Sequence, residues 1–86
     1  MHYSYDTFGT CSARIEFDVE EGRLHNVVFL GGCNGNLQGI GRLVEGMRVD
    51  EVMTRLEGIS CNGGPTSCPD QLSRALRQVA RADGDM

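Results

Sequence analysis

Four cysteines are the side chains of this 86-residue sequence with the clearest potential for chemistry. Cys61 and Cys68 are separated by a short stretch that includes Gly63-Gly64-Pro65, whereas Cys11 and Cys33 stand farther apart. Thiolate sulfur is a preferred ligand of zinc, which takes four ligands in a tetrahedral arrangement. Glycines near the ligands allow backbone amides to turn toward the sulfurs. We therefore predict that Cys11, Cys33, Cys61 and Cys68 bind one metal ion, for which zinc fits best.

Other roles for these cysteines stay open. The spacing lacks the Cys-x2-Cys pairs of zinc fingers, and reduced cysteines often serve as small buried apolar residues. Disulfide or iron–sulfur chemistry is a further alternative. Cys68 also stands at a predicted helix start, a position at which cysteines are often nucleophiles. His2 and His25 are expected on the sheet and far from Cys68, which leaves such a nucleophile without a nearby base.

Composition limits the protein to one domain and disfavours two classes of partner. With 40% apolar residues the chain can bury a single small core. A bound metal would stabilise such a core. All eight basic residues are arginine and face 12 acidic ones, so the net charge of −4 disfavours nucleic-acid binding. No apolar run approaches the roughly 20 residues of a membrane helix, and the first residues do not resemble a signal peptide. We expect a cytoplasmic domain that does not bind membranes.

Two segments predict a β-hairpin. Residues 13–20 alternate apolar and charged side chains, which is typical of a half-buried strand. A turn at Glu21-Gly22-Arg23 leads to a second strand over residues 24–30, which is rich in apolar and β-branched residues. Residues 2–7 are expected to add a third strand. The residues predicted to face the core from the first segment are Ala13, Ile15, Phe17 and Val19.

The register of the hairpin decides whether two of the cysteines meet. A turn centred on Gly22 places residues of the same parity opposite one another on one face of the sheet. Leu24 breaks this alternation, so we expect a β-bulge or looser pairing beside the turn. The predicted cross-strand pairs are Phe17 with Val27, Ile15 with Phe29, and Cys11 with Cys33.

Helical spacing of apolar residues begins after the second strand. Asn36 suits the N-cap of a first helix, whose buried residues are predicted to be Leu37, Ile40, Leu43, Val44 and Met47. Gly39 and Gly41 in this helix indicate close packing against the sheet. A second helix is predicted over residues 50–57 and is closed by Gly58; its buried residues would be Val52, Met53 and Leu56.

The last helix is predicted to begin at Ser67-Cys68-Pro69-Asp70. Proline suits a first helical turn, and a carboxylate is favoured near the positive end of the helix dipole. Its predicted buried stripe comprises Leu72, Ala75, Leu76, Val79 and Ala80. Arg74, Arg77 and Arg81 line one side of this helix, where a solvated face is favoured over a phosphate site.

These elements predict an α+β domain over residues 1–86: a small three-stranded antiparallel sheet followed by three helices packed on one face. Residues 82–86 are expected to form a frayed tail. Val28 and Leu30 would then point away from the helices, with Tyr3 or Tyr5 beside them. Such an exposed apolar face predicts a homodimer. The glycine-rich residues 31–36 lack the pattern of a P-loop or a dinucleotide site, so as an anion-binding motif they are weak.

Several blocks of the sequence, in order, resemble the TSCPD domain family. Thr66-Ser67-Cys68-Pro69-Asp70 matches the signature after which that family is named. The similarity covers about residues 3–80 and is to the small stand-alone members. The other matching blocks are residues 9–12 (GTCS), 26–40 (NVVFLGGCNGNLQGI), 44–47 (VEGM) and 58–61 (GISC).

The resemblance implies a cytoplasmic bacterial protein that binds metal and is associated with deoxyribonucleotide synthesis. A similar domain lies at or near the C-terminus of adenosylcobalamin-dependent ribonucleotide reductases. The family association extends to ribonucleoside-diphosphate reductase activity, but 86 residues cannot hold the barrel, radical-forming cysteine and cobalamin pocket of such an enzyme. The Cys-x-x-Cys tail of these reductases is also missing here.

Three functional hypotheses follow from the residues and the resemblance. The first is a non-catalytic, zinc-binding module that binds a protein or nucleic-acid partner, with a ribonucleotide reductase or another protein favoured over a nucleic acid. The second is an accessory to ribonucleotide reduction that uses its thiols for redox chemistry. The third is a redox or metal-transfer protein with an exposed cysteine cluster. Metal analysis separates the first from the others, and thiol titration with and without a chelator separates the second.

Overall fold

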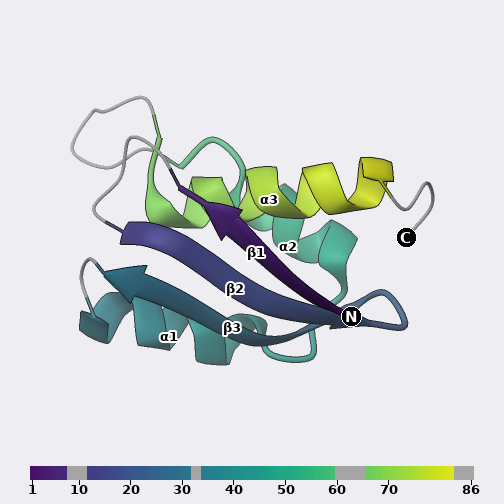
Figure 1. Ribbon diagram of the computed structural model, residues 1–86, viewed down its shortest axis with the longest axis horizontal. Helices are drawn as coiled ribbons and strands as arrows, with labels where there is room; N and C mark the ends of the chain where they lie inside the picture. Colours follow the sequence, from purple (N-terminus) through teal and green to yellow (C-terminus); the bar gives the residue numbers. More distant parts are fainter. Residues whose placement is uncertain (8–11, 32–33, 60–65, 83–86) are drawn as a thin grey trace.

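Three antiparallel strands and three helices form the α+β fold that the sequence predicts (Figure 1). The computed structural model describes residues 1–7, 12–31, 34–59 and 66–82. The strands are β1 (His2–Asp6), β2 (Ser12–Glu20) and β3 (Arg23–Gly31), and their order in the sheet is β1-β2-β3. The helices follow as α1 (Asn34–Val44), α2 (Val49–Leu56) and α3 (Cys68–Ala82).

A two-residue turn joins β2 and β3. Glu21 and Gly22 both have positive φ angles, 53° and 77°, between the paired residues Glu20 and Arg23. Positive φ at both central positions is characteristic of tight hairpin turns, and glycine adopts it without steric cost. The turn therefore matches the predicted one.

A β-bulge lies in β3 a few residues beyond the turn. Glu16 pairs with Val28 but Asp18 pairs with His25, so Asn26 and Val27 together lie opposite Phe17. Asn26 has a positive φ of 57°. The bulge confirms the parity break expected near Leu24, which is fully buried. The predicted pair of Ile15 with Phe29 is confirmed, whereas Phe17 faces the bulge rather than Val27 alone.

A second register shift lies at the start of β2. Ser12 pairs with Gly31 and Arg14 pairs with Leu30, so Ala13 is an extra residue on its strand. The shift explains why Ala13 is exposed although the alternation predicts it in the core. The predicted pair of Cys11 with Cys33 lies outside the described residues. The nearest described pair, Ser12 with Gly31, is displaced by one residue from the predicted register.

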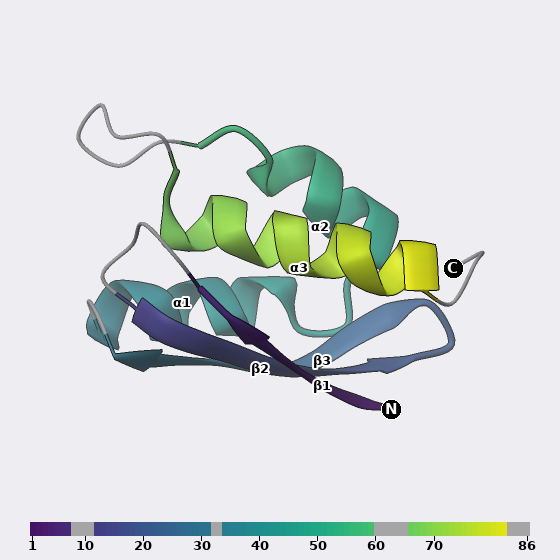
Figure 2. The same ribbon diagram turned by 45° about the horizontal axis from the view of Figure 1, so that its top comes forward.

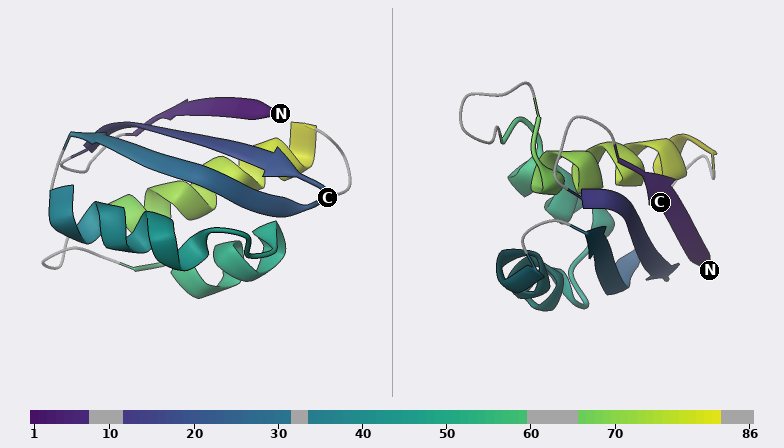
Figure 3. Two further views of the ribbon diagram at one scale, coloured as in Figure 1. Left: turned by 90° about the horizontal axis from the view of Figure 1, so that it is seen from below. Right: turned by 60° about the vertical axis from the view of Figure 1, so that its left-hand side comes forward.

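All three helices lie on one face of the sheet (Figures 2 and 3). α1 packs along β3, and α2 packs against α3. Burial of the apolar residues shared by these layers provides the main favourable free energy of folding. The buried core comprises Ile15, Phe17, Leu24, Val44, Val49, Val52, Leu72, Ala75, Leu76 and Val79.

Close contact between α1 and β3 depends on Gly41. A Cβ atom on this residue would lie 2.9 Å from the carbonyl oxygen of Val27, which is closer than real side chains approach backbone. Gly39 has open space at the same position, so the predicted close packing holds for Gly41 alone. Leu43 is 79% exposed rather than buried, because it lies two residues beyond Gly41 and a helix turns about 100° per residue.

The two faces of the sheet differ in character. Tyr3 and Tyr5 pair with Phe17 and Ile15 and pack against the core, so they lie on the covered face and not beside Val28 as predicted. The open face carries Val28 and Leu30, exposed by 48% and 42%, as expected. Among the described helices, none has the length and apolar character needed to span a membrane.

The connection between α1 and α2 runs beside the first residues of β3. The Gly46 amide donates to the Leu24 carbonyl oxygen at 2.7 Å, and the Leu24 amide donates to that of Met47 at 2.9 Å. The Val49 amide donates to the carbonyl oxygen of Gly22 at 2.9 Å. These bonds join the hairpin turn to the start of α2.

Candidate functional site

Residues 66–70 form the N-terminal cap of α3. The Ser67 hydroxyl accepts a hydrogen bond from the Asp70 amide at 3.2 Å, and the Ser67 carbonyl oxygen accepts one from the Gln71 amide at 2.8 Å. Ser67 is therefore the N-cap residue, and it satisfies amides that have no partner within the helix. Pro69 fits the first turn because its missing N–H would not form a helical hydrogen bond there.

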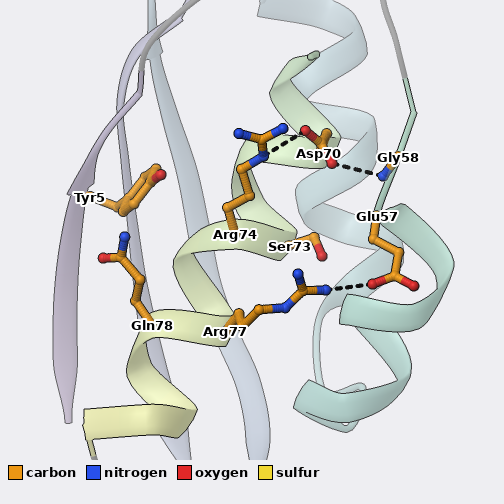
Figure 4. A pocket seen from close by; sticks show the side chains of 8 residues that line it. All are labelled: Tyr5, Glu57, Gly58, Asp70, Ser73, Arg74, Arg77 and Gln78. Atoms are coloured by element: carbon orange, nitrogen blue, oxygen red, sulfur yellow. Dashed lines mark hydrogen bonds and ion pairs between the residues drawn. The ribbon is translucent and has the colours of Figure 1, made fainter. Parts of the chain in front are cut away.

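The Asp70 carboxylate joins three segments of the chain (Figure 4). It accepts hydrogen bonds from the Gly58 amide at 2.7 Å, the Thr66 hydroxyl at 2.5 Å and Arg74 Nε at 2.9 Å. Asp70 is only 4% exposed. Buried carboxylates require such partners, because transfer from water otherwise carries a large free-energy penalty. The carboxylate thus fixes the end of α2 and residue 66 against the first turns of α3.

Burial and hydrogen bonding act in opposite directions on the pKa of Asp70. Burial raises the pKa, whereas the hydrogen bonds from Thr66 and Gly58 and the positive charge of Arg74 lower it. The favourable contacts prevail, so the pKa of Asp70 lies below its ordinary value. Asp70 is therefore ionised at neutral pH, and Arg74 balances its charge.

The residues on either side of the 60–65 segment are bonded to each other. The Ser67 hydroxyl donates to the Ile59 carbonyl oxygen at 2.6 Å, in addition to the bond between Gly58 and Asp70. Thr66 Oγ1 accepts a hydrogen bond from Gln71 Nε2 at 3.0 Å. Together these bonds form a polar cluster, comprising Gly58, Ile59, Thr66, Ser67, Asp70, Gln71 and Arg74, which we call the α3 cap.

Gln71 and Ser73 are buried polar residues that the helical pattern did not single out. Gln71 is 0% exposed and bonds Thr66, while Ser73 is 1% exposed and donates to the Met53 carbonyl oxygen at 3.1 Å. The apolar stripe of α3 is confirmed for Leu72, Ala75, Leu76 and Val79. A pattern based on apolar spacing alone assigns polar residues to the solvent. Gln71 and Ser73 therefore gave no signal of burial in the sequence, because neighbours of Leu72 in the chain lie about 100° away from it around the helix.

Cys68 is the one predicted metal ligand that the structure describes. It is the first residue of α3, and it is 6% exposed. Cys11, Cys33 and Cys61 lie outside the described residues. Within residues 1–7, 12–31, 34–59 and 66–82, no three histidine, cysteine or acidic side chains are grouped as metal ligands.

The elements that flank the predicted ligands converge at one end of the molecule. The end of β1, the start of β2, the end of β3 and the starts of α1 and α3 all lie at the left in Figure 1. Pairing of Ser12 with Gly31 holds the start of β2 beside the end of β3. The α3 cap draws residues 58 and 59 to the start of α3.

The two histidines lie toward the opposite end of the sheet. His2 begins β1 and His25 is near the beginning of β3, whereas Cys68 begins α3 (Figure 1). His25 Nδ1 is 2.7 Å from Glu45 Oε2, and His2 contacts Asp18 and Glu16. His2 is thus engaged by carboxylates of β2, and His25 by a carboxylate that directly follows α1.

Comparison with known proteins identifies one family. A family model described as the TSCPD domain matches residues 1–80 of the 86-residue chain. No curated protein and no solved structure gives a significant match to the chain. Because the family match covers most of the chain, the protein belongs to the TSCPD domain family.

Proposed function

We propose that this TSCPD-domain protein is a non-catalytic module in which Cys11, Cys33, Cys61 and Cys68 bind one zinc ion. The observation that carries the proposal is the convergence of strand and helix ends around the start of α3 (Figure 1). Chain segments that carry four thiols and are anchored at one end of a small domain suit a single tetrahedral site. Binding a metal there would add folding free energy to a small core.

The α3 cap gives Cys68 the surroundings of a fixed ligand. The cysteine stands between the N-cap Ser67 and the buried carboxylate of Asp70, so its backbone is held from both sides. The positive end of the helix dipole attracts negative charge, which suits a metal-bound thiolate. Four thiolates placed close together would repel one another unless a cation neutralised them. This donor set supports zinc over oxygen-preferring cations such as magnesium.

Metal analysis of purified protein tests this proposal. We expect about one zinc per chain in the native protein and a substantial loss of both zinc and thermal stability in Cys68→Ser. Ala75→Ser is the matched control, because Ala75 is 1% exposed on the same helix and gains a buried hydroxyl without loss of a thiol. The control should lose stability but keep its zinc.

Alkylation of the thiols gives an independent readout. All four should resist alkylation until a chelator is added, because a metal-bound thiolate is a poor nucleophile while it stays coordinated. A native protein without metal whose thiols react immediately would contradict the zinc proposal. Disulfides between Cys11 and Cys33 or between Cys61 and Cys68 would instead favour a thiol redox function.

We further propose that the module acts as an accessory to ribonucleotide reduction. Membership of the TSCPD domain family supports this role, because a similar domain occurs in adenosylcobalamin-dependent ribonucleotide reductases. Sedimentation of the zinc-loaded protein with a purified adenosylcobalamin-dependent ribonucleotide reductase tests it. We expect co-sedimentation, and no reduction of nucleoside diphosphates by the module alone. Absence of a complex at micromolar concentrations would contradict the accessory role.

A further inference from the structure

A hollow of about 720 Å³ lies between β1, the end of α2 and α3 (Figure 4). Arg74 and Arg77 extend into it from successive turns of α3. Tyr5 lies on the β1 side of the two arginines, and Glu57 lies on the α2 side. Three elements therefore contribute polar side chains to one concave surface.

Arg74 is a fixed cation at this surface. Its Nε donates to the buried carboxylate of Asp70 at 2.9 Å, and Asp70 is itself held by Gly58 and Thr66. An arginine has five N–H donors, and within the described residues the two Nη groups of Arg74 make no hydrogen bond. The Arg74 side chain is 49% exposed, so these donors are available at the surface of the hollow.

Arg77 is a second cation with an exchangeable partner. Its Nη2 donates to Glu57 Oε2 at 2.5 Å, but the two side chains are 48% and 52% exposed. An exposed ion pair of this kind contributes little to stability, so Glu57 can be replaced by another anion at small cost. The Tyr5 hydroxyl has no hydrogen-bond partner in the described part of the chain, and Tyr5 lies on the opposite side of the two arginines from Glu57 (Figure 4).

We propose that this hollow binds a phosphate monoester in its dianionic form, through Arg74 and Arg77, with displacement of Glu57. Guanidinium groups match the geometry of phosphate oxygens and can bind them bidentately. Arg74 already pairs with Asp70 through Nε, so the ester would contact its Nη groups. A monoanion would replace only the single charge of Glu57 on Arg77, whereas a dianion has a second charged oxygen that can accept hydrogen bonds from those Nη groups. The volume leaves room for the organic part of the ester against Tyr5.

Two of the arginines of α3 differ from the solvated stripe that the sequence indicates. The sequence favours a solvated face for Arg74, Arg77 and Arg81. Arg74 and Arg77 line a concave surface, and the buried carboxylate of Asp70 holds Arg74 in place. An anion-binding site needs such preorganised cations, which a freely solvated face does not provide.

Titration with phenyl phosphate and benzenesulfonate at pH 7.5 tests the proposal. The two probes have similar shape, but phenyl phosphate is mostly a dianion at this pH and benzenesulfonate is a monoanion. We expect phenyl phosphate to bind more tightly and to shift the Nε–Hε resonances of both arginines in NMR spectra. Inorganic phosphate as a third probe shows whether the aromatic part adds affinity.

Charge variants of the hollow make the test specific. Arg77→Gln should weaken phenyl phosphate binding roughly tenfold, because a charge-assisted contact is lost. Glu57→Gln should strengthen binding about two- to fivefold, because the competing carboxylate is removed. Glu51→Gln is the matched control, since Glu51 forms a similar exposed ion pair with Arg55 on α2 but does not line the hollow.

Two results would overturn the phosphate site. One is equal binding of the sulfonate and the phosphate, and the other is an affinity in Glu57→Gln no higher than in Glu51→Gln. These variants leave all four cysteines in place, so the outcome is independent of the zinc proposal.

Discussion

Two polar networks in this protein are built from similar groups but differ in their exposure to water. Within the α3 cap, Asp70 accepts hydrogen bonds from a backbone amide, a hydroxyl and an arginine, and its side chain is 6% exposed. On the open face of the sheet, Asp18 accepts a hydrogen bond from Asn26 at 2.9 Å and lies 2.8 Å from His2 Nδ1. The Asp18 side chain is 29% exposed.

The difference shows which network holds the fold together. The pKa values of both carboxyl groups are lowered, Asp18 chiefly by the Asn26 hydrogen bond and then by His2. A lost partner on the open face is replaced by water, whereas a lost partner at Asp70 leaves a buried group unsatisfied. Similar hydrogen-bond partners therefore have unequal consequences for stability.

Asp70→Asn should be the most damaging single change in either network. The amide cannot accept three hydrogen bonds and balance Arg74 as the carboxylate does, and we expect a loss of about 2–4 kcal/mol in the free energy of unfolding. Urea denaturation and thermal melting measure the loss, with a fall of roughly 10 °C or more in Tm. Asp18→Asn is the control and should melt close to the native protein. Equal destabilisation by the two variants would refute the comparison.

Ser67→Ala tests the helix-capping part of the α3 cap. Loss of an N-cap hydroxyl costs about 1 kcal/mol, and here the bond to the Ile59 carbonyl oxygen is lost as well. Ser4→Ala is the matched control, because Ser4 is exposed on β1 of the open face. Urea denaturation should give a lower midpoint with an unchanged slope for Ser67→Ala and no change for Ser4→Ala. A midpoint for Ser67→Ala equal to that of the native protein would show that the cap is dispensable.

The pH dependence of stability should separate the two networks further. The lowered pKa of Asp70 means that its stabilising contribution is complete above the ordinary value of 3.8 and is lost as the pH falls through the native pKa. The pKa of His2 is raised, chiefly by its hydrogen bond with Asp18, so its contribution is present below 6.5 and is lost as the pH rises through the native pKa.

Denaturation curves between pH 3 and 8 measure both effects. Asp70→Asn should flatten the acid limb, while His2→Gln should remove a smaller decline on the neutral side. Retention of the native acid limb in Asp70→Asn would assign acid unfolding to other carboxylates.

Sequence patterns located the start of α3 but not the residues from elsewhere in the chain that hydrogen-bond to it. Ser67, Pro69 and Asp70 have the types and order of a helix start, so local chemistry alone predicts the cap. The partners Gly58 and Ile59 come from the end of another helix, and their contact depends on how α2 packs against α3. Tertiary packing of this kind has no local signal.

Register was predictable only in part for a similar reason. Strict alternation identified Ile15 opposite Phe29, and the parity break at Leu24 indicated a bulge. The second bulge, at Ala13, gave no signal, since alanine is compatible with either face. Leu43 fits the apolar spacing of α1, but the position of Gly41 against β3 decides which side of that helix is buried.

Among the changes considered, loss of self-association should have the smallest effect on the stability of the folded chain. We propose that Val28 and Leu30 form the centre of a homodimer interface on the open face, because they are exposed by 48% and 42%. Leu30→Lys should shift the protein toward monomer in sedimentation velocity at near-physiological salt, with little change in melting temperature. Leu43→Lys is the control, since Leu43 is exposed on α1. A native protein that sediments as a monomer would contradict this proposal.

The chain that connects α1 to α2 has a consequence for aggregation. Edge strands expose backbone donors and acceptors that can recruit a strand from another molecule. Gly46, Met47 and Val49 already bond the backbone of residues 22 and 24, and the Glu45 carboxylate accepts from the Asn26 amide at 2.8 Å. The first half of the β3 edge is therefore closed to strand addition. A second molecule could approach this sheet through its open face far more readily than along that edge.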